Sequence, residues 1–142
     1  MTHGSSFSTR RRVAALLLAA ACMAATQAHA APGYGEPYVT DRENARSGAE
    51  SFKRRVGKLF VIAPLNDIGA GGQQLTSVWF AVETRVAPPN TQIGILHVKA
   101  PPHAPRVTFG MSPPDGGWPE GEYRVELLMN GIKVTEVEFS ID

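Results

Sequence analysis

An Asn-Gly dipeptide between two stretches of alternating residues constrains the fold of this chain more than any other feature. Asn130 and Gly131 both adopt positive φ readily, and together they favour a tight β-hairpin turn. Apolar side chains occupy alternate positions on both sides of the turn: Tyr123, Val125, Leu127, Val137, Phe139 and Ile141. A period of two gives a strand one buried and one solvated face, so residues 121–141 predict an antiparallel hairpin over a core.

The register of this hairpin predicts an irregularity in its second strand. A two-residue turn would place Glu136 opposite Val125 and so turn a carboxylate toward the core, which is costly for an unpaired charge. One extra residue in the second strand places Val137 opposite Val125 instead. We therefore predict a β-bulge near Val134-Thr135, or a loop of odd length.

Four further stretches have the length and composition of strands. They lie at residues 59–63, 77–86, 93–99 and 107–112, and proline-rich or glycine-rich segments separate them. Pro64 is expected to end the first strand, and Trp79 is expected to face the opposite side of its strand from Phe80. We find no amphipathic helix pattern after residue 30. The sequence predicts an all-β domain over residues 52–142, an antiparallel β-sandwich of about six to seven strands.

The end of the chain also resembles a known class of domain. The pattern W-P-x-G-x-Y-x-V-x-L-x-x-N-G-x-x-V-x-x-x-x-F-x-I, from Trp118 onward, is similar to the last two strands of small immunoglobulin-like β-sandwich domains in exported bacterial proteins. Many of those domains have no assigned function. The resemblance implies an immunoglobulin-like fold and export, and it brings no functional residues because the matching positions belong to the turn and the core.

The first 30 residues are typical of a secretory signal peptide. Arginines at positions 10–12 precede an apolar run over residues 13–25 that is too short to span a bilayer as a stable helix. An Ala-x-Ala site ends at Ala30, so we expect cleavage before Ala31, export to the periplasm or the medium, and no transmembrane span in the mature chain. Two alternatives stay open, a twin-arginine signal for export of the folded protein and lipid attachment at Cys22.

Cleavage would change the charge of the chain. It removes three of the 14 basic residues and none of the 13 acidic ones, which takes the net charge from +1 to −2, and it removes the single cysteine. An acidic, exported chain without a basic, aromatic-rich face argues against nucleic-acid binding. Residues 31–51 are poor in large apolar side chains, and we expect them to form a flexible N-terminal arm.

A basic cluster, Lys53, Arg54 and Arg55, follows the arm. Such a cluster is typical of a solvated segment leading into the first strand of a domain. Its functional alternative is a contact with an anion, such as a lipid phosphate or a polyanion.

We find no motif of catalysis or metal binding in the mature chain. Its two histidines, His97 and His103, lie near each other in the sequence, but a metal site needs more ligands and no carboxylate is close by. No Gly-x-Ser-x-Gly nucleophile motif occurs. The glutamate pairs at 120/122 and 136/138 belong to a face that is expected to be solvated, whereas catalytic carboxylates need a cleft. The sequence therefore predicts no catalytic residue, no metal site and no cofactor.

These features favour an exported, non-enzymatic binding module with an unidentified protein or envelope partner. The candidate interaction surface combines the two tryptophans with the basic cluster: Trp79, Trp118, Lys53, Arg54 and Arg55. Such a module should have an exposed apolar patch or an open strand edge. The alternative is a structural or accessory subunit of a cell-envelope assembly, which should self-associate or copurify with a larger partner. A metal-binding protein or a small enzyme is the third hypothesis.

Overall fold

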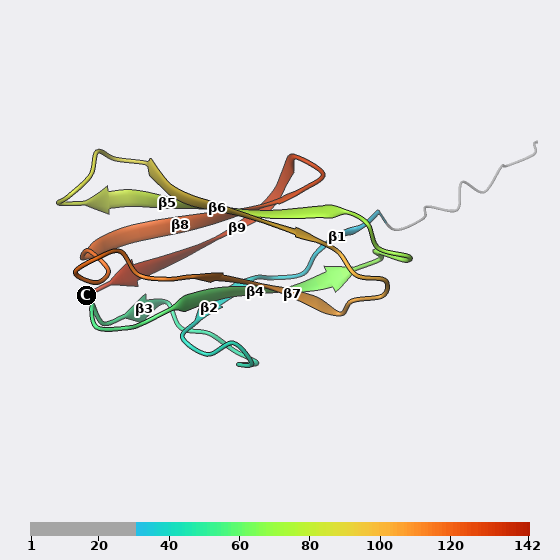
Figure 1. Cartoon of the computed structure of the whole chain (residues 1–142), viewed down its shortest axis with the longest axis horizontal. Coiled ribbons are helices and arrows are strands. Elements are labelled where there is room, and N and C mark those ends of the chain that lie inside the picture. Colours follow the sequence, from blue (N-terminus) through green and yellow to red (C-terminus); the bar gives the residue numbers. More distant parts are fainter. Residues whose placement is uncertain (1–30) are drawn as a thin grey trace, which may run out of the picture.

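The computed structural model describes residues 31–142, which form nine β-strands (Figure 1). The expected signal peptide, with Ala30 and Cys22, lies outside the described residues. The strands are β1 (Gly33–Tyr34), β2 (Tyr38–Thr40), β3 (Ser51–Phe52), β4 (Leu59–Asn66), β5 (Gln74–Thr84), β6 (Thr91–Lys99), β7 (Arg106–Met111), β8 (Gly121–Met129) and β9 (Ile132–Ile141). From residue 31 to residue 142, no helix is long and apolar enough to cross a membrane.

The strands form two sheets that pack face to face, seen as two layers in Figure 1. In the first sheet, β1 and β2 pair with successive parts of one edge of β4, and β7 pairs with the other edge. The second sheet has five strands in the order β3-β9-β8-β5-β6, and only the β3–β9 pair in it is parallel. This arrangement confirms the predicted all-β, immunoglobulin-like sandwich.

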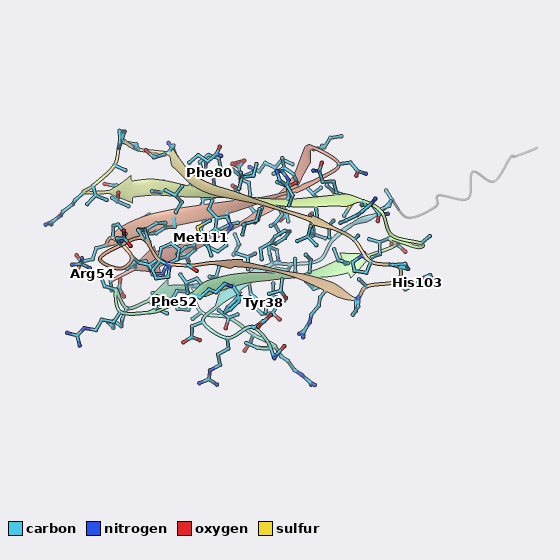
Figure 2. All side chains as sticks on the ribbon, in the orientation of Figure 1. Tyr38, Phe52, Arg54, Phe80, His103 and Met111 are labelled. Atoms are coloured by element: carbon cyan, nitrogen blue, oxygen red, sulfur yellow. The ribbon has the colours of Figure 1, made fainter. Side chains whose placement is uncertain are left out.

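Alternating side chains fill the space between the sheets. On β8, Tyr123 is 2% exposed, and Val125 and Leu127 are fully buried. Trp79 on β5 points into the core and Phe80 lies on the outer surface of the five-stranded sheet (Figure 2), so the two side chains face opposite sides of the strand, as predicted. The Tyr123 hydroxyl donates a hydrogen bond of 2.5 Å to the carbonyl of Pro119, four residues upstream. A tyrosine that fixes the start of a strand in this way is a feature of immunoglobulin-like sandwiches.

The β8–β9 hairpin contains the predicted bulge. Val125 lies opposite Val137, but Leu128 lies opposite Lys133, so Val134 is the extra residue of β9. The Asn-Gly turn keeps its two-residue form, with positive φ at both positions. The bulge keeps the apolar residues of β9 on the core side and its glutamates in solvent, which is the physical reason for the prediction.

Strand β4 continues through Pro64, where the sequence predicted the end of a strand. Pro64 lies opposite the break between β1 and β2, and its carbonyl accepts a hydrogen bond of 2.8 Å from the Gly35 N–H. In a strand, the N–H and the carbonyl of one residue point to the same side. Proline has no N–H, and the donor that Pro64 lacks would have pointed toward the break between β1 and β2, where no strand residue needs it. The prediction was wrong because a proline ends a strand only where its missing N–H would leave a ladder hydrogen bond unmade, and at this break no such bond is lost.

Residues 31–51 do not form the predicted flexible arm. They contribute β1 and β2 to the first sheet and end at β3, on the edge of the second. Val39 is only 1% exposed, and the Tyr34 hydroxyl donates a hydrogen bond of 2.6 Å to the Leu128 carbonyl in the opposite sheet. A few well-placed apolar residues and backbone pairing hold this segment, although its composition is mostly polar.

Candidate functional site: the two edges of the five-stranded sheet

Both tryptophans of the predicted interaction surface lie in the core. Trp79 and Trp118 have 0% of their surface exposed, and their rings stack at a centroid distance of 6.4 Å. Each indole N–H has an internal acceptor, Ser77 Oγ at 3.0 Å for Trp79 and the Gly57 carbonyl at 2.9 Å for Trp118. Neither side chain therefore offers a ring face or a polar group to a partner, which corrects this part of the prediction.

The basic cluster is exposed, as its composition suggests. Lys53, Arg54 and Arg55 follow β3 in a turn, which the Val56 N–H closes by donating to the Lys53 carbonyl at 2.9 Å. Figure 2 shows Arg54 near Phe52 at one end of the sandwich. Arg54 makes a long ion pair of 4.0 Å with the exposed Glu120, and such a pair contributes little to stability. The proposed contact with an anion stays a prediction.

The two histidines lie in different surroundings. His97 is exposed on β6, and its Nδ1 atom is 2.8 Å from Thr76 Oγ1. His103 lies in the β6–β7 loop, at one end of the molecule in Figure 2, and its backbone N–H donates to the Gly69 carbonyl at 2.8 Å. No group of three or more potential metal-ligating side chains occurs in the part of the chain that the structure describes.

The first candidate site is the free edge of β6, which we call the β6 edge (residues 91–99). Among the described strands, β6 pairs with β5 alone, so the backbone on its other side has no strand partner. A register shift relative to β5 makes Ile93 a bulge and leaves residues 94–99 as the regular part of the edge. The side chains of Ile93, Ile95 and Val98 are 37%, 47% and 38% exposed. Natural edge strands are usually protected by charges or prolines, and this one presents aliphatic side chains.

Packing on both faces holds β6 in place. On the outer face, Ile95 lies opposite Val78 of β5. On the inner face, a Cβ atom added to Gly94 would collide with the terminal methyl group (Cε) of Met111. Figure 2 shows Met111 between the two layers. The exposed edge is thus part of a packed strand and differs from a loosely attached segment.

The second candidate site is a groove at the opposite side of the same sheet. It has a volume of about 1090 Å³ and lies between the free part of β9 and the segments 34–39 and 48–50, and we call it the β9 groove. Val39 and Val137 line it between the sheets, and Tyr34 also lines it, with its hydroxyl bonded to the Leu128 carbonyl across the sandwich. The groove exists because β3 pairs with only the last residues of β9, Ser140 and Ile141.

Among the described residues, five glutamates and no lysine or arginine line the β9 groove. They come from the β1–β2 link, the position before β3, the start of β8 and the middle of β9: Glu36, Glu50, Glu122, Glu136 and Glu138. All five side chains are exposed.

Within the part of the chain that the structure describes, one of these glutamates forms ion pairs. Glu136 forms ion pairs with Arg124 at 3.4 Å and with Lys133 at 3.2 Å. The hydrogen bonds of Lys133 with Glu136 and Glu126 raise the pKa of its ammonium group. Among residues 31–142, no ion pair involves the other four glutamates of the groove. The groove is therefore a region of negative potential.

Sequence reasoning missed both edges as sites. Apolar residues at consecutive positions of β6, Ile95 and Leu96, are a signal that was present, because a strand with one solvated face should alternate. The β9 groove left no comparable signal, because its walls come from segments about 90 residues apart in the chain.

Comparison with known proteins supports the fold. An immunoglobulin-like protein from Pseudomonas aeruginosa, solved as a crystal structure, superposes with a TM-score of 0.57 at 18% sequence identity, covering 81% of this chain and 99% of that protein. At this identity the likeness shows an immunoglobulin-like fold alone.

Two enzymes contain a region of similar shape. A β-glucosidase from Listeria innocua has a TM-score of 0.48 at 14% identity, and the match covers 78% of this chain but 16% of the enzyme. An alkylpurine DNA glycosylase from Pseudomonas fluorescens has a TM-score of 0.48 at 12% identity, over 78% of this chain and 30% of the glycosylase. Scores below 0.5 carry no argument about function. No protein-family model matches the chain, and no curated protein matches it.

Proposed function

We propose that the chain is an exported, non-enzymatic interaction module that binds an extended segment of a protein partner along the β6 edge. The observation that carries this proposal is the regular stretch 94–99, whose backbone is unpaired on one side among the described strands. A strand added to a free edge gains main-chain hydrogen bonds, and alternate side chains then select the sequence.

The side chains at the β6 edge favour an apolar partner segment. Ile95 points to the outer face of the sheet, opposite Val78, and Val98 points toward the space between the sheets, opposite Leu75. A partner strand would therefore cover aliphatic surface on both of its faces. Lys99 is the one charged residue of β6, so a segment rich in aliphatic residues and free of proline fits this edge best.

The first 30 residues support the proposed location of the module. Their basic start, short apolar run and Ala-x-Ala site support export to the periplasm or the medium. An envelope protein is therefore the class of partner that the proposal names, and a role as an accessory subunit of an envelope assembly is the alternative. The same β6 edge could serve that role by pairing with β6 of a second copy.

The test compares two lysine substitutions in the mature chain. Ile95→Lys places a charge on the β6 edge, whereas Ile132→Lys places the same charge at the tip of the β8–β9 hairpin, where Ile132 is 71% exposed. An envelope protein bound to the wild-type chain should be lost with Ile95→Lys and retained with Ile132→Lys. Amide hydrogen exchange in residues 94–99 should slow in the complex, because an added strand protects those amides.

Each result of this test has a defined meaning. Loss of binding in both variants, or in neither, would contradict the proposal. Concentration-dependent dimerisation in sedimentation, abolished by Ile95→Lys alone, would replace the partner segment with a second copy and support the assembly role.

A further inference from the structure

We propose that the β9 groove binds an extended cationic peptide in which basic residues alternate with apolar ones. The groove lies at the other side of the five-stranded sheet from the β6 edge. The inference therefore goes beyond the proposed function and stands or falls separately from it.

The backbone of β9 is oriented to receive a strand. The Ser140 N–H donates to the Glu50 carbonyl at 2.9 Å, and the Asp142 N–H donates to the Phe52 carbonyl at 2.9 Å. Backbone groups alternate in direction along a strand, so the N–H groups of Glu136 and Glu138 point to the same side. No described strand pairs with that side of β9 before residue 140.

The free part of this edge is long enough for a specific contact. It covers residues 132–138, and at about 3.3 Å per residue these seven residues span about 23 Å. The bulge at Val134 limits regular pairing to the part nearest β3. An added segment would lie in the row that β3 begins, with one end close to Glu50.

The two faces of β9 select different residues in the added segment. Glu136 and Glu138 lie on the outer face, and basic side chains directly opposite them would form cross-strand ion pairs. Val137 lies on the inner face, and with Val39 it lines the apolar depth of the groove. An alternating pattern of basic and apolar residues satisfies both faces of one strand.

The charge of the β9 groove favours a cationic peptide as its ligand. The lining holds five glutamates and no basic residue, and four of those glutamates have no ion pair within residues 31–142. A neutral or acidic strand would leave these carboxylates uncompensated, whereas lysine or arginine side chains would be attracted to them.

Close contacts at two glycines, Gly48 and Gly35, hold the walls of the groove. A Cβ atom on Gly48 would collide with the Val39 carbonyl oxygen, and the Ala49 N–H donates to that same carbonyl at 2.9 Å. A Cβ atom on Gly35 would lie 2.9 Å from the Pro64 Cβ. The groove is thus formed before any ligand arrives, which lowers the entropic cost of binding.

The experiment uses three capped heptapeptides as probes. The first alternates lysine and valine, the second alternates glutamate and valine, and the third repeats the first with proline at its central position. The proline peptide keeps the charge of the first but cannot form a continuous strand. Binding to the mature chain is measured by calorimetry, and the contacted amides are identified by NMR shifts and hydrogen exchange.

Matched variants test the role of charge in the groove. Glu50→Gln/Glu138→Gln removes two unpaired carboxylates of the groove, and Glu43→Gln/Glu83→Gln removes two exposed carboxylates outside it. We expect the groove variant to weaken binding of the Lys-Val peptide about five-fold, and the control variant to leave it unchanged. The Glu-Val and proline peptides should bind at least about ten-fold more weakly than the Lys-Val peptide.

Slowed exchange of the Glu136 and Glu138 amides, with the Lys-Val peptide alone, is the expected result. Equal binding of the Lys-Val and proline peptides would overturn the inference, because charge alone would then explain the contact. Equal weakening in both Glu→Gln variants, or no binding, would also overturn it. Protection confined to residues 94–99 would overturn this inference and leave the proposal for the β6 edge in place.

Discussion

The β6 edge and the β9 groove lie at opposite sides of one sheet and differ in what surrounds their free backbone. The β6 edge has aliphatic side chains on both faces and one charged residue, Lys99. The free part of β9 has glutamates around it, a bulge and a neighbouring β3 that covers only its last residues. Proteins need to protect free strand edges from unwanted pairing. The difference teaches that this chain protects β9 by charge and leaves β6 suited to apolar contact.

Phe52→Ala should have the largest effect on this comparison, because Phe52 anchors β3 on the edge of β9. Its ring contacts Phe139 edge to face at a centroid distance of 6.2 Å. We expect a loss of about 3 kcal/mol in the free energy of unfolding by urea. The Ser140 amide should also exchange faster, because its acceptor is the Glu50 carbonyl. Ser51→Ala is the control, and equal stability of the two variants would show that β3 is not held by this ring.

Gly48→Ala should have the next largest effect, a loss of about 2 kcal/mol in the free energy of unfolding. The added methyl group would meet the backbone carbonyl of Val39, which cannot rotate away as a side chain can. The strain should move residues 48–50 and change the shape of the β9 groove while the β6 edge keeps its NMR shifts. Gly57→Ala is the control, because a Cβ there has open space around it. An unchanged urea midpoint for Gly48→Ala would contradict the close packing of this wall.

High pH should destabilise the fold through two tyrosines, the half-buried Tyr34 beside the β9 groove and the buried Tyr123 in the core. Burial raises the pKa of Tyr34 to about 12, although a hydrogen bond with the Thr76 backbone opposes the shift, and burial raises that of Tyr123 to about 12. The unfolded chain releases these protons near pH 10, before the folded chain does. Stability should therefore be constant below about pH 10 and fall as the pH rises toward 12.

Urea unfolding at pH 9, 10, 11 and 12 measures this loss, which we expect to be about 1 kcal/mol for each tyrosine after allowance for solvent screening. Tyr34→Phe and Tyr123→Phe should each flatten part of the pH dependence. If the wild-type protein and the double variant Tyr34→Phe/Tyr123→Phe had the same dependence of stability on pH, neither tyrosine would have a raised pKa in the folded state.

Gly94→Ala should have the smallest effect, below about 1 kcal/mol. The added methyl group on β6 meets the end of the Met111 side chain, and methionine can change rotamer to make room. Comparing the stability of Gly94→Ala with that of Gly48→Ala sharpens the contrast between the two edges. Both glycines are crowded, but an added Cβ meets backbone atoms only at Gly48. If Gly94→Ala costs less stability when Met111→Ala is also present, the contact between these residues is confirmed. A loss of stability for Gly94→Ala equal to that for Gly48→Ala would contradict it.

The parts of the structure that follow from local chemistry were predictable. The Asn-Gly turn and the energy of burying a carboxylate were enough to predict the bulge at Val134. The alternation around Trp79 predicted that Trp79 and Phe80 face opposite sides of β5, although it did not indicate which side faces the core. In each case the residues that form the sequence pattern lie within a few positions of the residues whose orientation they determine.

The parts that depend on the order of strands were not predictable in this way. The exposure of Ile95 follows from the position of β6 at the end of the sheet, which a period of two does not encode. The burial of Trp118 follows from its contact with Trp79, and β4 passes Pro64 because β1 and β2 leave a gap there. Long-range topology decided all three.

The aromatic cluster of the core has a consequence for the conditions in which the domain can fold. Many immunoglobulin domains tie their two sheets with a disulfide next to a buried tryptophan, whereas residues 31–142 contain no cysteine. Here Trp79, Tyr123 and Phe139 of the five-stranded sheet pack with Trp118 of the β7–β8 loop, with ring centroids 5.0–6.4 Å apart. The same core cluster includes Val61 and Phe109 of the first sheet. The sheets are thus joined by packing, so the folded state needs no oxidant. Its urea midpoint should be the same with and without a reductant, on either side of a membrane.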